Sequence, residues 1–298
     1  MCEFCIEHGE GKKWYLLMKN YSKELLHQEL SGAEAEESRA QTRAEWLRRF
    51  SELFSGAAAL GTVMSREQLA GLVSTSELAG KAEAQRLEGR KVVHFGQVLP
   101  IEDVEEVLDL VTSIIRIPCG CRFLAIGKTD KRYCFGLGMD PLGIMGKYPD
   151  SSASLEVLDR EEAKKIIRQL DDEGLIHTIW TAITPYVVGI CNCDRDCLAY
   201  KSYIEQRGTP TFFRAEYVAR IDPELCSGCK ECLKQCQFDA QFYSSARGKV
   251  DINPTRCYGC GVCRASCPTQ AISLIPRKDE PKVANLWLKE EAAVQAAP

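Results

Sequence analysis

Eight of the sixteen cysteines in this 298-residue chain lie in two runs with the same internal spacing. Each run reads C-x2-C-x2-C-x3-C, and the second follows the first at a constant offset of 31 residues, from Cys226 to Cys257. The match extends beyond cysteine, because four further residues have identical counterparts at this offset: Ile221/Ile252, Pro223/Pro254, Gly228/Gly259 and Ala240/Ala271. The repeat therefore predicts one duplicated module near the C-terminus.

This cysteine spacing is that of a bacterial-type ferredoxin with two [4Fe–4S] clusters, in which the fourth thiolate of each run binds the cluster of the other run. We therefore expect one cluster on Cys226, Cys229, Cys232 and Cys267, and the other on Cys257, Cys260, Cys263 and Cys236. Glycines 228, 259 and 261 allow the backbone to curl around the clusters. The second run is followed by Pro268, whereas the first is followed by Gln237. This position is next to a ligand and is not itself a ligand, so the difference should not prevent cluster binding. Structural zinc is the alternative, but zinc sites usually combine two separated cysteine pairs.

A second group of cysteines lies in the middle of the chain: Cys119, Cys121, Cys134, Cys191, Cys193 and Cys197. Two C-x-C pairs follow predicted strands, so each pair can present two thiolates from one turn. We expect a third metal centre whose compact part is Cys191, Cys193 and Cys197, completed by one of Cys119, Cys121 and Cys134. A third [4Fe–4S] cluster and zinc both suit this spacing. Structural free thiols, a redox-active thiol pair or disulfides are the alternative. Arg122 stands beside these thiols, where it can stabilise thiolate charge, although an arginine is more often an ordinary surface or salt-bridge residue.

A third candidate site lies at the N-terminus, where Cys2, Cys5 and His8 form C-x2-C-x2-H. That spacing is compatible with metal ligands on one turn, and the role of these residues stays open. His27, His94 and His177 are isolated in the sequence, so we expect core or surface positions for them. The chain has no glycine-rich phosphate loop and no dinucleotide fingerprint, so a flavin or nicotinamide bound by this chain alone is unsupported.

Composition argues against several classes of protein. The formal net charge of -4 creates no field that would favour nucleic acid or membrane. No apolar run is long enough to span a bilayer, and the first residues lack the pattern of a secretory signal. Clustered thiols in a chain of this length indicate metal ligands or redox groups and not a disulfide scaffold. We therefore expect a cytoplasmic protein of an anaerobic or low-oxygen setting.

The remaining pattern predicts an α+β protein. Apolar residues at helical spacing predict helices near residues 33–60, after Pro100, and from Arg160 to Asp172. Strands are expected at 114–118, 175–180 and 186–190, with a short helix through Cys197 and Tyr203. We expect four parts: a mainly helical region at 1–110, a cysteine-rich α+β domain at 111–215, a dicluster ferredoxin domain at 216–277, and a tail at 278–298 anchored by Trp287 and Leu288.

Together these motifs resemble a group of prokaryotic 4Fe-4S dicluster ferredoxin-domain proteins that are common in anaerobes. The resemblance covers roughly residues 101–276, and the segments that carry it ahead of the ferredoxin module are Pro118-Cys119-Gly120-Cys121-Arg122, Tyr133-Cys134-Phe135-Gly136, Gly174-Leu175-Ile176-His177 and Cys191-Asn192-Cys193. It implies electron transfer, usually as an accessory to a larger redox system. Relatives often carry a further cysteine after the second C-x-C, whereas Asp194 stands there in this chain.

The sequence therefore predicts an iron–sulfur electron-transfer protein or subunit that passes single electrons to or from a partner redox enzyme. The alternative is a reductase or activating protein whose middle cysteines carry a catalytic or redox cofactor site. A redox-responsive regulator is a third hypothesis, because the helix–Gly174–strand stretch resembles a winged helix. The absence of a basic recognition helix argues against DNA binding.

Overall fold

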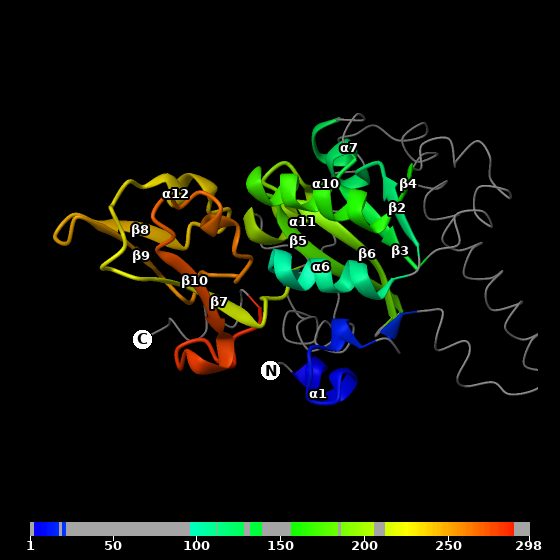
Figure 1. The fold of residues 1–298 in the computed structure, drawn as a ribbon, viewed down its shortest axis with the longest axis horizontal. Helices are drawn as coiled ribbons and strands as arrows, with labels where there is room; N and C mark the ends of the chain where they lie inside the picture. Colours follow the sequence, from blue (N-terminus) through cyan, green and yellow to red (C-terminus); the bar gives the residue numbers. More distant parts are fainter. Residues whose placement is uncertain are drawn as a thin grey trace, which may run out of the picture.

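The computed structural model describes residues 3–17, 20–21, 96–111, 113–127, 132–138, 156–183, 186–205 and 212–288. These residues form two units that lie side by side, one built around a large sheet and one around two small sheets (Figure 1). The helix predicted near residues 33–60 lies outside the described residues.

The elements follow one another along the chain as α1 (Glu3–Gly9), η1 (Trp14–Leu16), β1 (Gln97–Leu99), α6 (Ile101–Leu110), β2 (Ile114–Ile117), α7 (Gly120–Ile126), β3 (Cys134–Leu137), β4 (Glu156–Leu158), α10 (Arg160–Asp172), β5 (Ile176–Ile183), β6 (Tyr186–Cys193), α11 (Leu198–Tyr200), η3 (Lys201–Glu205), β7 (Tyr217–Ile221), α12 (Glu231–Gln235), β8 (Gln241–Ser244), β9 (Lys249–Ile252), η4 (Val262–Arg264), β10 (Ile272–Pro276) and η5 (Arg277–Asp279).

The first unit is a six-stranded sheet with the order β1-β5-β6-β3-β2-β4, in which every neighbouring pair is antiparallel. Strand β1 pairs with β5, and α6 packs on α10. The division expected at residue 110 therefore passes through this unit, because β1 and α6 belong to the same sheet and core as the strands that follow.

Two long helices of this unit agree with the sequence pattern. Helix α6 begins directly after Pro100, which occupies the N-cap. Helix α10 begins with a capping box, in which the Asp159 carboxylate accepts from the Glu162 amide and the Glu162 carboxylate accepts from the Asp159 amide. Gly174 follows this helix at φ +85°, a conformation that glycine adopts without strain.

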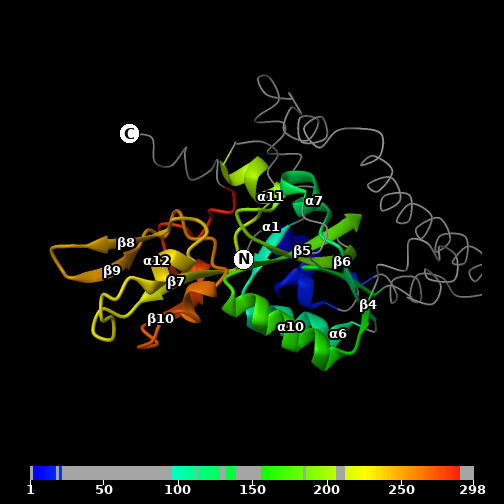
Figure 2. The same cartoon turned by 90° about the horizontal axis from the view of Figure 1, so that it is seen from above.

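The two faces of the sheet differ in what they bury. Figure 2 shows α6 and α10 together on one side and α7 and α11 together on the other. Ile179 and Ile190 contribute to the apolar core under α6 and α10. Because strand side chains alternate, Cys191 and Cys193 point to the opposite face, toward α7 and α11. Strand β6 is three residues longer than predicted and so includes both cysteines.

The second unit shows how the duplicated sequence folds. Strands β7 and β9 occupy equivalent positions in the two repeats, as do β8 and β10. Strand β7 nevertheless pairs with β10, and β8 pairs with β9. One sheet therefore joins the start of the first repeat to the end of the second. This pairing brings the last cysteine of the second repeat close to the first three cysteines of the first repeat.

Among the described helices, none has the length and apolar character needed to cross a membrane.

Candidate metal centres

The first predicted quartet of the ferredoxin module gathers around one cavity, called here the Cys226 site. Cys226, Cys229, Cys232 and Cys267 all line it, together with Ile221, Lys230, Val250 and Thr269, and the cavity with its mouth measures about 290 Å³. Cys267 comes from the second repeat and reaches this site through the β7–β10 pairing. Cys229 is exposed, so this site lies at the surface of the module.

The second quartet gathers around another cavity, called here the Cys236 site. Cys236, Cys257, Cys260 and Cys263 line it with Phe238, Tyr258, Ile252 and Val262, and the cavity with its mouth measures about 330 Å³. Cys257, Cys260 and Cys263 are buried, and Cys236 is partly buried. This site is therefore more enclosed than the Cys226 site.

The loops around both cavities are shaped for close approach of the backbone. Gly228, Gly259 and Gly261 all have positive φ, as the sequence predicted. The amides of Ala240 and Ala271, which are equivalent in the repeat, donate to the sulfurs of Cys236 and Cys267 at 3.3 Å. Amide donors of this kind stabilise thiolate sulfur.

The chemistry of these donors fits an iron–sulfur cluster. Burial raises the pKa of Cys232 to about 11 and raises the pKa of Cys260 further. Metal binding removes the thiol protons, and the positive charge of the bound iron then compensates the thiolates that burial alone disfavours. Four thiols and donated amides around each cavity are the environment in which iron–sulfur clusters are held.

The middle cysteines also come together, and we call Cys119, Cys121, Cys134, Cys191, Cys193 and Cys197 the six-cysteine cluster. Cys134 and Cys191 are register partners on β3 and β6. The sulfurs of Cys193 and Cys197 are 3.4 Å apart. Hydrogen bonds from Cys121 and Cys193 lower the pKa of Cys197, whereas a hydrogen bond with Cys134 and burial raise the pKa of Cys119. Cys121 lies in α7, a helix that the sequence pattern did not predict.

Arg122 supplies a buried positive charge to this cluster. Its side chain is 1% exposed, donates to the Cys119 sulfur at 3.2 Å and to the Asn192 carbonyl at 3.1 Å, and pairs with the Asp194 carboxylate at 2.9 Å. Asp194 therefore acts as the partner of Arg122, which accounts for the acidic residue after the second C-x-C. A buried guanidinium on a cysteine sulfur favours the thiolate form of that cysteine.

Two further observations concern single metal ions. Among the described residues, no three His, Cys, Asp or Glu side chains are arranged as they stand to hold a single metal ion, and this includes the six-cysteine cluster. At the N-terminus, the buried Cys5 thiol donates to the Glu216 carboxylate at 3.1 Å. Cys2 lies outside the described residues, so the C-x2-C-x2-H motif stays a prediction.

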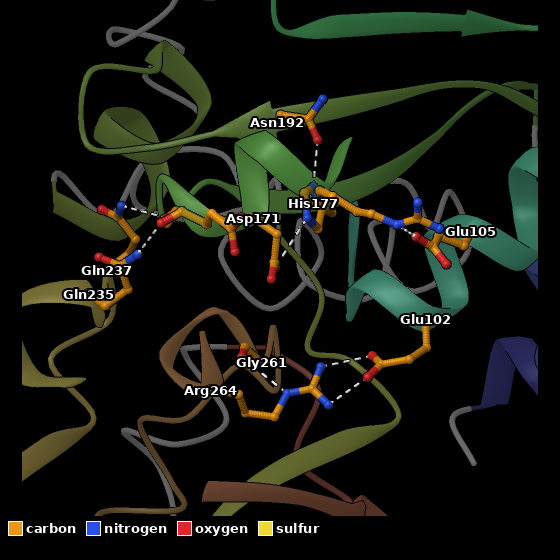
Figure 3. Close-up of polar contacts among 12 residues, drawn as sticks. Glu102, Glu105, Asp171, His177, Asn192, Gln235, Gln237, Gly261 and Arg264 are labelled. Carbon is orange, nitrogen blue, oxygen red and sulfur yellow. Dashed lines mark hydrogen bonds and ion pairs between the residues drawn. The ribbon is translucent and has the colours of Figure 1, made fainter. Parts of the chain in front are cut away.

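His177 is buried between the sheet and α10, as expected for a core histidine. Its Nδ1 is 2.6 Å from the Asn192 side-chain oxygen, and its Nε2 is 3.3 Å from the Asp171 carboxylate (Figure 3). Asn192 separates Cys191 from Cys193 and points to the other face, so His177 supports the strand that carries two of the six cysteines.

The Cys236 site faces the first unit. The Gln235 and Gln237 amides donate at 3.0 Å to the Asp172 and Gly174 carbonyls at the end of α10, and Arg264 forms a bidentate pair with Glu102 at 2.7 and 2.8 Å (Figure 3). These contacts place Cys236 and η4 against α10 and α6. Sequence reasoning did not identify them, because isolated glutamines and arginines carry no periodic signal.

Three aromatic rings fill the space between the Cys236 site and the six-cysteine cluster. Tyr200, three residues after Cys197, lies 6.1 Å from Phe238, which stacks on Tyr258 with centroids 4.0 Å apart. Phe238 and Tyr258 line the Cys236 site. Cys193, Cys197 and Cys260 belong to one apolar core with these rings. Cys257 and Cys263 of the Cys236 site belong to a second core, which also contains Cys232 of the Cys226 site.

Comparison with known proteins supports the assignment of the second unit. The family described as 4Fe-4S dicluster domain matches residues 225–271. Archaeal-type glutamate synthases (NADPH) from Thermotoga sp. and Thermotoga maritima are each 37% identical over 59 residues, and one from Dehalococcoides mccartyi is 31% identical over 62 residues. These alignments cover 20–21% of this chain and 12% of each relative.

The fold, the cysteine quartets and the family match together define a 4Fe-4S ferredoxin-type domain in the C-terminal part of the chain. Such a domain points to iron–sulfur electron transfer. Because the aligned stretch is about an eighth of the synthases, the likeness does not extend to their activity as whole proteins.

Proposed function

We propose that this chain is an electron-transfer protein that passes single electrons through two [4Fe–4S] clusters to or from a partner redox enzyme. Cys226, Cys229, Cys232 and Cys267 hold one cluster, and Cys257, Cys260, Cys263 and Cys236 hold the other. Each cluster accepts and releases one electron without a change in covalent bonding to substrate. The single observation that carries the proposal is that each predicted quartet lines a cavity of its own.

The chain's own residues do three things in this function. The cysteines bind the clusters, and the amides of Ala219, Ala240 and Ala271 donate to cysteine sulfurs. The aromatic rings at Phe238 and Tyr258 exclude water from the Cys236 site. The exposed Cys229 places the Cys226 site where a partner protein can approach.

The six-cysteine cluster is proposed as a third metal centre, either a [4Fe–4S] cluster or zinc. Its support is the convergence of six thiols from β3, β6, α7 and the flanking loops, with the buried guanidinium of Arg122 on the Cys119 sulfur. Asp194 already pairs with this cation, so the guanidinium can donate to a metal-bound thiolate at Cys119 without being left as an unpaired buried charge. The clustered, partly exposed thiols also support a cytoplasmic location in an anaerobic cell.

The test is metal analysis of anaerobically purified protein with electron paramagnetic resonance. We expect about eight irons per chain for two clusters, with additional iron or zinc if the third centre is loaded. Cys232→Ala should lose iron, and Cys193→Ala should lose only the third metal. Cys5→Ala tests the N-terminal motif separately, and it should leave the iron of the two clusters unchanged, because Cys5 lines neither cavity. A chain that purifies without iron would contradict the proposal.

The second candidate is a reductase or activating protein in which the six-cysteine cluster performs chemistry with electrons from the ferredoxin module. The continuous aromatic contact between the two favours it. It requires a bound cofactor other than a cubane, or reoxidation of the reduced protein that depends on a substrate. If alanine at Cys119 and Cys121 left spectra and all activity intact, this candidate would be excluded.

A further inference from the structure

Two arginines are buried side by side beneath the Cys236 site. Arg214 and Arg277 are 1% and 0% exposed. Both donate to the Cys257 carbonyl, at 3.2 and 3.3 Å, and Arg277 also donates to the carbonyls of Ala215 and Tyr217. Both guanidinium groups therefore lie directly behind the first ligand of the Cys236 site.

This positive charge is compensated only in part. The Arg214 guanidinium lies 4.2 Å from the centroid of the Tyr258 ring, and that of Arg277 lies 5.8 Å from the centroid of the Trp287 ring. Arg214 Nε and Arg277 Nη1 are buried and lack a hydrogen-bond partner among the described residues. The Glu216 carboxylate acts on Arg277 and can offset one of the two cations. Buried like charges are costly unless an anion lies close by. Four thiolates outweigh the positive charge of an iron–sulfide core, so the loaded Cys236 site supplies that anion.

The Cys226 site has no comparable support within the described residues. The cation that lines it is Lys230, which is exposed and lies over the Tyr243 ring. Exposed charges are screened by water and salt, whereas buried charges are screened much less. Reduction adds one negative charge to a site, so a buried cation favours reduction more than an exposed one.

We propose that Arg214 and Arg277 hold the reduction potential of the Cys236 site above that of the Cys226 site, so that electrons arriving at the surface settle on the inner site. This rests on the proposed function, because it requires both quartets to be loaded. One electron leaves a reduced one-electron carrier, the Cys226 site transfers it onward, and the Cys236 site is reduced. The carrier is oxidised by one electron, and no covalent bond is broken.

The sign of this difference is informative. Burial alone disfavours an added negative charge and would place the enclosed Cys236 site at the lower potential. With the arginines present, the Cys236 site has the higher potential. It is also the site that lies next to the six-cysteine cluster, through Phe238 and Tyr200, so electrons flow toward that cluster. The arginines therefore reverse the order that burial would set and direct electrons inward.

The first test is a redox titration of the full-length wild-type protein followed by electron paramagnetic resonance. The Cys226 signal is assigned as the one that relaxes faster when an aqueous dysprosium chelate is added, because Cys229 is exposed. We expect the shielded signal to appear at the higher potential. A shielded signal at an equal or lower potential would overturn the inference and leave the proposed function intact, whereas absence of both signals and of iron would overturn both.

The second test uses charge variants. In Arg214→Gln and Arg277→Gln we expect the equilibrium constant for reduction of the inner site to fall at least tenfold, about 59 mV for one electron, with the outer site unchanged. Arg214→Lys keeps the charge and should stay near wild type. Arg256→Gln is the matched control, since Arg256 precedes Cys257 but is exposed and faces Asp239. Equal shifts in Arg214→Lys and Arg214→Gln would assign the effect to hydrogen bonding and refute the inference.

Discussion

At the residue scale, Arg122 organises the six-cysteine cluster. Its guanidinium contacts the Cys119 sulfur, the Asn192 carbonyl and the Asp194 carboxylate, and it lies 4.3 Å from the centroid of the Tyr133 ring. One side chain thus joins the loop before α7 to the end of β6. Its removal leaves buried acceptors without a donor, which is costly in a protein interior.

We therefore predict that Arg122→Met lowers the free energy of unfolding by about 3 kcal/mol, the low end of the range for breaking a buried ion pair, because Asp194 keeps partial contact with water. The measurement is urea unfolding under anaerobic conditions. Arg168→Met is the control, because the Arg168–Glu105 pair lies on the surface and its loss should matter far less. Equal unfolding midpoints for the two variants would contradict this role of Arg122.

The sequence predicts the roles of some of these residues and not of others. The grouping of the eight ferredoxin cysteines could be predicted, because their spacing is set by the size of a cluster. Arg214 and Arg277 could not, since each stands alone in sequence and gains its role only when Cys257 is brought between them. Asp194 illustrates the same limit, because its partner Arg122 is distant in the chain.

At the element scale, the ligand loops depend on glycine for two separate reasons. Gly259 has φ +75°, and a Cβ there would lie 2.1 Å from the Tyr217 carbonyl oxygen. Gly248, in the β8–β9 turn, has φ +64°, but its nearest atom to such a Cβ is 4.0 Å away. A side chain at Gly248 would therefore meet backbone strain alone, whereas a side chain at Gly259 would meet both backbone strain and a steric clash.

We predict that Gly248→Ala costs about 1–2 kcal/mol from backbone strain alone, and that Gly259→Ala costs more. The additional cost arises because β7 must move away from the loop that holds Cys257 and Cys260. Unfolding free energy and iron content measure the two effects, and we expect loss of iron only in Gly259→Ala. Similar behaviour of both variants would show that the contact with Tyr217 has no energetic role.

Elements with a complete local pattern were predicted well. Helix α10 has a capping box, an apolar face and a terminating glycine, and its range agrees with the structure. Strands β1 and β4 have three residues each, and α7 has seven, so their local signals are too short to identify them. These three depend on long-range pairing, and α7 carries one of the six cysteines.

At the scale of the whole molecule, contacts between the units hold the Cys236 site against the sheet. Lys13 bridges Asp103 in α6 and the Tyr217 hydroxyl at 2.6 and 2.5 Å, so the N-terminal segment also spans the junction. Such an arrangement could not be read from the sequence, because no motif specifies which face of a ferredoxin module contacts its neighbour. The repeat predicted the module, and the side chains around Cys236 set its orientation.

The Arg264–Glu102 pair provides a pH test of this junction. Hydrogen bonds from Arg264 lower the pKa of Glu102 below its ordinary value of 4.5. Folding therefore favours the charged carboxylate, so the stabilisation is fully present above about pH 4.5 and is lost as pH falls through the lower folded pKa. Because the Glu102 side chain is 57% exposed, its contribution at pH 7 should not exceed about 1 kcal/mol.

We predict that Glu102→Gln destabilises the protein at pH 7 and that the difference from wild type shrinks as pH falls below 4.5. Glu106→Gln, an exposed change on the same helix, should have little effect at either pH. Urea unfolding at several pH values measures both variants. Because Arg264 follows the proposed ligand Cys263, loosening this pair should also make the inner site more accessible to an aqueous chelator. An unchanged chelation rate in Glu102→Gln would show that the junction is held by the glutamine and aromatic contacts instead.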